Sequence, residues 1–154
     1  MDDRRKKSKK RSAANSETQH KPFIFFIDQA LGRIVIAGAL RDAGHQVEHL
    51  TDIFSQDTSD DIWIEYVGKN NRLALTKDRK IKFRTGEINS IIKNKARIYR
   101  LSSGNLTGAE MAEIITKAAR AILRHAQKNP GPYIIGISRS GHLTKLALKK
   151  SRQK

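Results

Sequence analysis

The sequence predicts one α/β domain whose sheet is mainly parallel and carries helices on both faces. Short apolar runs of strand length alternate with longer segments whose apolar residues recur every three or four positions. Strands that alternate with helices form parallel sheets, because each helix carries the chain back to the start of the next strand. The chain has 154 residues, which is enough for one hydrophobic core.

The strands are expected at apolar runs that are bounded by turn residues. These runs lie at 23–27, 46–50, 73–76 and 96–101. A C-terminal hairpin is expected from 133–138 and 143–148, across the turn at 139–142.

The helices are expected between these strands. The first should end near Gly44, where glycine suits a positive φ. It should place five residues near one face, namely Leu31, Ile34, Val35, Gly38 and Leu40. After a polar loop at 51–59, the second is expected at 60–68, with one side formed by Ile62, Trp63, Tyr66 and Val67. A short helix is expected at 87–94.

The longest helix is expected at 108–127. Thr107 and Glu110 fit a capping box at its start, which satisfies two backbone N–H groups. Its apolar stripe consists of Met111, Ile114, Ile115, Ala118 and Ile122. An Asn-Pro-Gly-Pro run at 129–132 ends it.

The two ends of the chain are expected to lie outside the folded domain. Residues 1–21 are rich in Lys and Arg and contain nothing that a core could bury, so they are predicted to be a disordered basic tail. The folded domain is expected at 22–148, and 149–154 should form a basic C-terminal tail.

The charge distribution predicts a polyanionic partner. The net charge is +16, from 31 Lys and Arg against 15 acids, and no acid follows Glu113. Such an excess is typical of proteins that bind nucleic acid, although a solubilising surface explains it equally well. A row of cations at helical spacing, which could face RNA or solvent, consists of Lys117, Arg120, Arg124 and Lys128.

The composition also excludes several classes of protein. The chain has no cysteine, so disulfides and thiolate zinc sites are excluded. No apolar stretch approaches the roughly 20 residues of a membrane span, and the charged N-terminus lacks the apolar core of a secretory signal. A cytoplasmic protein without a membrane anchor is therefore expected. Neither a dinucleotide-binding glycine motif nor a P-loop is present.

Acidic residues occur at three comparable strand–helix junctions. Asp28 ends the first strand, Asp60 and Asp61 open the second helix, and Asp78 follows the third strand. The carboxyl ends of parallel strands share one edge of the sheet, so these side chains are expected to converge. Clustered carboxylates need cations, and oxygen ligands suit Mg²⁺ or Mn²⁺. The weaker candidates for this cluster are Glu48, Asp52 and Glu65.

Each of these acids also has a purely structural interpretation. Asp28 suits the cap of a helix, and Asp78 suits the first position of a turn. Asp60 and Asp61 would gain about 0.3–1 kcal/mol from the helix dipole, and Thr58 with Asp61 fits a capping box. Three acids at successive junctions favour a site over three separate caps.

Residues 45–49 match an inverted zinc-protease motif, H-x-x-E-H. That motif requires a helix, whereas the residues around Val47 indicate a strand. Residues four apart on a strand lie about 13 Å apart, which is too far for one zinc ion. His45 and His49 are therefore expected to be edge or loop residues.

Five segments together resemble the PIN-like domains of the VapC-type toxin family. They are Phe26–Asp28 with Leu31-Gly32, Leu40–Val47, Ser59–Trp63, Leu75–Asp78 and Leu101–Gly108. The similarity extends from Phe23 to Leu146, with the segments in the family's order. It implies a three-layer PIN-like domain that cleaves single-stranded RNA using Mg²⁺ or Mn²⁺. It also implies an antitoxin protein that blocks the site, and it is compatible with a homodimer.

The resemblance carries specific roles onto this chain. By position, Asp28, Asp60 and Asp78 correspond to the metal-binding and catalytic acids. Family members often carry a further acid or polar residue after the fourth strand. This chain has Ser103 and Asn105 there and no acid, which weakens a second metal site, and Asp61 is a further polar candidate.

The basic residues beside Asp78 complete the expected site. Lys77, Arg79 and Lys80 would bind the RNA backbone by their charge. The alternative is a catalytically inactive PIN-like module that binds nucleic acid or serves as a scaffold.

Overall fold

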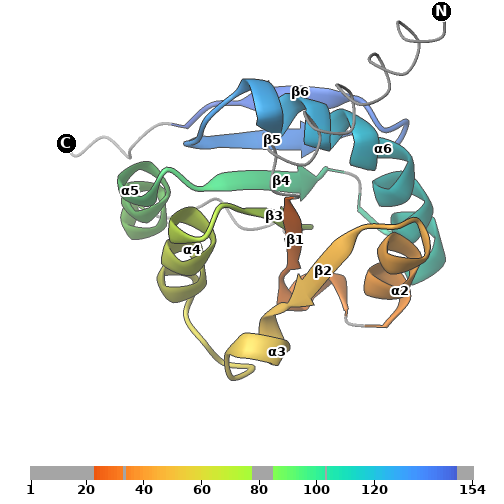
Figure 1. The fold of residues 1–154 in the computed structure, drawn as a ribbon, viewed down its shortest axis with the longest axis horizontal. Helices are drawn as coiled ribbons and strands as arrows, with labels where there is room; N and C mark the ends of the chain where they lie inside the picture. The colour runs from red at the N-terminus through yellow and green to blue at the C-terminus, as the bar shows by residue number, and fades with distance from the viewer. Residues whose placement is uncertain (1–22, 33, 78–84, 103, 149–154) are drawn as a thin grey trace, which may run out of the picture.

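The computed structural model describes residues 23–32, 34–77, 85–102 and 104–148. They form one six-stranded sheet in the order β2-β1-β3-β4-β5-β6. The strands are β1 (Ile24–Ile27), β2 (Gln46–His49), β3 (Arg72–Thr76), β4 (Arg97–Leu101), β5 (Tyr133–Ile137) and β6 (Leu143–Leu146). The first five pair in parallel, and β6 pairs antiparallel with β5 as the closing hairpin (Figure 1).

The helices lie on both faces of this sheet (Figure 1). They are the 3-10 turn η1 (Gln29–Leu31) and the α-helices α2 (Val35–Asp42), α3 (Leu50–Ile53), α4 (Asp60–Lys69), α5 (Thr85–Asn94) and α6 (Gly108–Lys128). Helices α2 and α6 pack together over one face, and α4 and α5 pack together over the other. The predicted three-layer α/β fold with a mainly parallel sheet is confirmed.

Two hydrophobic cores follow from the alternation of side chains along the strands. Phe25 and Ile27 of β1 pack into the core under α2 and α6, whereas Phe26 packs into the core under α4 and α5. Because neighbouring strands are in register, Ala74 and Ile98 lie on the same face as Phe26. Burial of both strand faces explains why the strands read as continuous apolar runs.

Helix α6 agrees with its sequence prediction in detail. The Thr107 hydroxyl accepts from the Glu110 N–H at 3.1 Å, and the Glu110 carboxylate accepts from the Thr107 N–H at 2.8 Å. The predicted stripe is buried throughout: Met111, Ile114, Ile115, Ala118 and Ile122. The capping box thus fixes the start of the helix, and the stripe fixes its face.

The first helix differs from its prediction. The chain forms η1, passes Gly32 at a φ of 78°, and begins α2 only at Val35. This break changes the helical phase, so Ile34 and Val35 are 81% and 51% exposed instead of buried beside Leu40. The expected continuous apolar face from residue 31 to residue 40 was therefore wrong.

The second helix and the loop before it differ in smaller ways. Ile62 is exposed and Ile64 takes its place in the core. The Thr58–Asp61 capping box is absent, because Thr58 bonds the Ser55 carbonyl and the helix starts after Ser59. The expected loop at 51–59 begins with helix α3, which the Asp52 carboxylate stabilises by accepting from the His49 N–H at 2.9 Å.

None of the helices within the described residues has both the length and the apolar character that a membrane crossing needs. The predicted basic tails at 1–21 and 149–154 lie outside the described residues.

Candidate functional site

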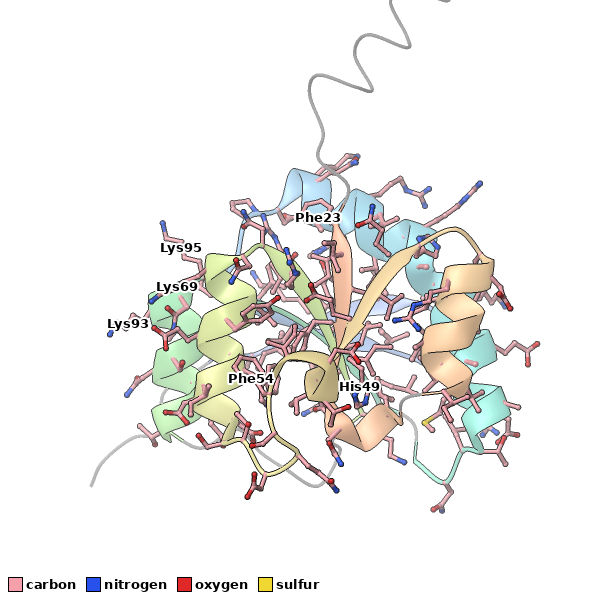
Figure 2. The ribbon with its side chains drawn as sticks, turned by 60° about the horizontal axis from the view of Figure 1, so that its bottom comes forward. Phe23, His49, Phe54, Lys69, Lys93 and Lys95 are labelled. Carbon is pink, nitrogen blue, oxygen red and sulfur yellow. The ribbon has the colours of Figure 1, made fainter. Side chains whose placement is uncertain are left out.

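The candidate site lies at the carboxyl edge of the sheet, between β1 and β3. After β1 the chain goes to β2 on one side, and it then crosses to β3 on the other side. The connections after β1 and β3 thus leave from a point where the strand order reverses, which is where open α/β sheets bind their ligands. Figure 2 shows Phe23 before the amino end of β1 and His49 at the carboxyl end of β2, on opposite edges.

Asp28 is held at this reversal point by β3. Its N–H donates to the Leu75 carbonyl at 3.1 Å, which continues the ladder between β1 and β3. Its Oδ2 atom accepts from the Thr76 hydroxyl at 2.6 Å. Asp28 is half-buried and is not the cap of α2, whose N-cap position is Ile34. The carboxylate is therefore oriented by the neighbouring strand, as a functional carboxylate at a sheet edge needs to be.

Asp60 is held in place by Trp63 in the first turn of α4. The Trp63 indole N–H donates to the Asp60 Oδ1 atom at 2.9 Å. The indole ring stacks on Phe26 of β1, with 5.7 Å between ring centroids and 21° between planes. The start of α4 is thereby packed onto the strand that carries Asp28.

Asp28 and Asp60 are displaced from this Phe26–Trp63 contact towards the same edge. Asp28 lies two residues beyond Phe26, about 6.6 Å along the strand. Asp60 lies three residues before Trp63, about 4.5 Å along α4, which begins at the carboxyl edge and ends with Lys69 towards the amino edge (Figure 2). Asp28 also lies on the α4 side of the sheet, because its side chain follows the alternation from Phe26. The structure therefore brings these two predicted acids to one edge and one face.

The other predicted site residues are only partly described. Lys77 is half-buried directly after β3, and the Asp61 carboxylate is exposed and accepts from the Ser59 hydroxyl. Asn105 is exposed with a φ of 54° in the loop between β4 and α6. Outside the described residues lie Asp78, Arg79, Lys80 and Ser103.

The weaker acidic candidates serve structural roles. Glu48 accepts from the Nε and Nη2 atoms of Arg72, both at 3.0 Å, and from the Tyr66 hydroxyl at 2.9 Å. This bidentate contact raises the pKa of the Arg72 guanidinium, and burial together with Glu48 raises the pKa of Tyr66. Glu65 forms a surface ion pair with Lys69, and this contact lowers the pKa of the Glu65 carboxyl.

The histidine motif does not form a zinc site. Residues 46–49 form strand β2, as the sequence predicted. The His49 Nδ1 atom accepts from the Thr51 N–H at 3.1 Å at the start of α3, and the ring of His45 packs edge-on against Phe25. His49 ends β2, which is an edge strand as the sequence allowed, and it is buried there, with 3% of its surface exposed.

Two residues on the same face and edge were missed from the sequence. Thr76 and Arg100 are partners across the β3–β4 ladder, and Thr76 contacts Asp28 directly. Side chains alternate between the two faces of a strand, so Thr76 lies on the same face as Ala74 and Arg100 on the same face as Ile98. This alternation could have been read from the sequence. Arg100 was not selected as a site candidate, because a charged residue within a strand ordinarily faces solvent.

The chemistry of these side chains suits a hard divalent cation. Asp28 and Asp60 offer only oxygen ligands, which Mg²⁺ and Mn²⁺ prefer. Within the described ranges, no three acidic or histidine side chains form a group that could hold a metal ion. Asp28 and Asp60 alone do not make up such a group, and Asp78, the third predicted acid, lies outside the described residues.

The chain is similar to known proteins over the elements that form this edge of the sheet. Residues 23–103, more than half of the chain, match the family model described as a PIN like domain. The protein named "Putative ribonuclease VapC45" from Mycobacterium tuberculosis (strain ATCC 25618 / H37Rv) is 27% identical over 116 residues, covering 73% of this chain and 83% of that protein. No solved structure matches the chain significantly. The family match spans the elements that carry Asp28, Asp60, Thr76 and Arg100, and the chain therefore belongs to the family of PIN-like domains.

Proposed function

We propose that this protein is a metal-dependent endoribonuclease that cleaves single-stranded RNA and acts as the toxin of a toxin–antitoxin pair. The observation that carries the proposal is the placement of Asp28 and Asp60 at one edge and face of the sheet, each oriented by a hydrogen bond. Membership of the PIN-like family and the similarity to a protein named as a ribonuclease support it. The net charge of +16 suits an RNA substrate.

Asp28, Asp60 and Asp78 would hold Mg²⁺ or Mn²⁺. When bound, such a cation lowers the pKa of a water molecule and stabilises the charge that develops on a phosphodiester. Thr76 keeps the Asp28 carboxylate directed along the edge, and Trp63 does the same for Asp60. The chain's own contribution to the chemistry is thus a preorganised pair of carboxylates.

The RNA backbone would be bound by cations at the same edge. Lys77 lies directly after the strand that orients Asp28, and Arg79 and Lys80 follow it in the sequence. Additional polar groups for a second cation would come from Asp61, Ser103 and Asn105, and the loop directly after β4 offers no acid. We therefore expect one tightly bound cation.

The proposal predicts that cleavage requires both the metal ion and Asp28. Purified protein should cut a single-stranded RNA in Mg²⁺ or Mn²⁺ and should stop in EDTA. Asp28→Asn should lower the rate at least a hundredfold, because the amide keeps the shape of the side chain and removes its charge. Glu65→Gln is the matched control, since this acid is exposed on α4 and pairs only with Lys69 among the described residues. Cleavage by Asp28→Asn at the rate of the control would refute the proposal.

A second candidate function is RNA binding without cleavage. It is favoured by the lack of an acid in the loop that directly follows β4 and by the hydrogen bonds that already occupy Asp28 and Asp60. This function predicts salt-sensitive RNA binding with no metal-dependent product. A protein antitoxin that binds this chain and suppresses cleavage would distinguish the toxin from the binding module. The proposed toxin is compatible with a homodimer.

A further inference from the structure

Arg100 places a half-buried positive charge at the carboxyl edge of the sheet. It is the residue before the last of β4 and lies between Thr76 of β3 and Gly136 of β5. Ile98 packs under α4 and α5, so the alternation of side chains directs Arg100 to that same face. Asp28 and Thr76 lie on this face too, in the same row across the sheet.

Arg100 lacks the partners that the other half-buried arginines have. Its Nε atom is buried without a hydrogen-bond partner, and no described carboxylate forms an ion pair with it. By contrast, Arg72 binds Glu48 with two nitrogens. Arg97, on the same strand as Arg100, donates to the Asn129 carbonyl and to the Asn71 side chain.

These three arginines differ in their position along the strands. Arg72 and Arg97 begin β3 and β4 at the amino edge, where the protein supplies their acceptors. Arg100 lies at the carboxyl edge, beside the acids. The side chain as a whole is only half-buried and no described carboxylate pairs with it, so its charge is available to an acceptor that arrives from outside the described chain.

We propose that Arg100 binds a phosphate group of the RNA strand, adjacent to the phosphodiester that lies at Asp28. This inference rests on the proposed function, because it takes RNA as the ligand of this edge. Neighbouring strands lie about 4.8 Å apart, so the Cα atoms of Asp28 and Arg100, two strands apart, are separated by about 10 Å. The planar guanidinium matches a phosphate with two parallel hydrogen bonds, which a lysine cannot offer. Arg100 would thus set the position of the RNA strand relative to the carboxylates.

The first experiment measures the contact itself, independently of cleavage. The full chain carrying Asp28→Asn is ¹⁵N-labelled, kept in EDTA, and titrated with a single-stranded oligoribonucleotide, with inorganic phosphate or with polyglutamate. The Nε–H signal of Arg100 should shift with RNA and, at higher concentration, with phosphate, while that of Arg97 stays in place. An equal or larger shift with polyglutamate than with RNA would overturn the proposal in favour of an acidic protein partner.

The second experiment measures affinity for RNA. Arg100→Gln should raise the Kd for the oligoribonucleotide about tenfold, since it removes a charge-assisted contact. It should also reduce the slope of log K against log salt by about 0.7, the value for one phosphate on a single strand. Arg97→Gln is the control on the same strand and should leave Kd and slope unchanged. If Arg100→Gln does not fold, Arg100→Lys should fold and give a smaller loss of affinity.

The two proposals fail in different ways. RNA binding at an unchanged Kd by Arg100→Gln or Arg100→Lys, without a shift of the Arg100 signal, overturns the role of Arg100 and leaves the nuclease intact. If the wild-type protein binds RNA through Arg100 but gives no metal-dependent product, the nuclease is refuted and the phosphate contact stands.

Discussion

At the scale of single residues, the central feature is the hydrogen bond from Thr76 to Asp28. It spans 2.6 Å and joins residues 48 positions apart in the sequence. Carboxylates at functional sites need such support, because a free side chain loses entropy when it binds a ligand. In the proposed nuclease, Thr76 would be a positioning residue that acts on the substrate only through Asp28.

Substitution of Thr76 tests this role. Thr76→Val keeps the shape of the side chain and removes the hydroxyl, so metal-dependent cleavage should fall about 10–100-fold, as is usual for residues that support a metal ligand. Thr76→Ser should restore most of the activity. The measurement is the cleavage rate as a function of Mn²⁺ concentration, and an unchanged Mn²⁺ dependence in Thr76→Val would argue against the role.

The sequence was informative for residues at strand ends and weak for residues within strands. The placement of Asp28 and Asp60 at one edge was predictable, because the carboxyl ends of parallel strands share one edge of the sheet. Thr76 and Arg100 were not, because their roles depend on which strand lies beside which, and register is a property of the whole sheet. Ile34 was misplaced because nothing in the apolar pattern indicated the break at η1 and Gly32.

At the scale of elements, the Glu48–Arg72 pair holds β2 against β3 across β1. Both side chains are largely buried, at 23% and 21% exposed, and the contact is bidentate. Arg72 also lies over the ring of Tyr66 of α4, 5.6 Å from its centroid. The pair thus ties two strands and one helix together at the amino edge of the sheet.

Breaking this pair should affect stability and leave cleavage intact. Arg72→Gln leaves a half-buried carboxylate with fewer donors, so the free energy of unfolding should fall by about 1–3 kcal/mol. Urea denaturation measures this loss. The cleavage rate below the unfolding transition should match the wild type, and a loss of Mn²⁺ dependence instead of stability would show that Glu48 belongs to the metal site.

The helix α6 contributes a pH-dependent contact. The His125 Nδ1 atom lies 2.9 Å from the Tyr99 hydroxyl, which lies 2.6 Å from the Tyr133 hydroxyl. Burial lowers the pKa of His125, and the charges of Arg97 and Lys145 lower it further. The folded protein therefore favours the neutral ring, which accepts a hydrogen bond from Tyr99.

This contact predicts that the protein is less stable in mild acid. Above the ordinary histidine pKa of about 6.5, His125 is neutral in both states and its contribution is complete. As the pH falls from about 6.5 towards the lower pKa of the folded state, the unfolded state binds the proton more readily and stability is lost. Unfolding midpoints in urea between pH 7.5 and pH 5 should show this decline. His125→Gln cannot take up the proton, so its decline should be shallower, and an equal decline in both proteins would contradict the assignment.

At the scale of the whole molecule, the charged residues of the proposed site lie at the opposite edge of the sheet from the arginines that the protein itself pairs. At the amino edge, Arg72 and Arg97 donate hydrogen bonds to acceptors within the protein. Figure 2 shows Lys69, Lys93 and Lys95 together near the ends of α4 and α5. The carboxyl edge holds Asp28, Thr76, Lys77 and Arg100 around the reversal of strand order. The parallel sheet was predictable because its strands alternate with helices, whereas strand order was not, because alternation leaves the order free.

In the proposed nuclease, Asp28 and Asp60 share a divalent cation at this edge. Crystals of the full chain grown with Mn²⁺ and measured at a wavelength where manganese scatters anomalously would test it most directly. The account predicts one strong anomalous peak in contact with carboxylate oxygens of Asp28 and Asp60, and its loss in crystals of Asp28→Asn. An ordered carboxyl edge without a peak at millimolar Mn²⁺, or a peak that Asp28→Asn leaves unchanged, would contradict it.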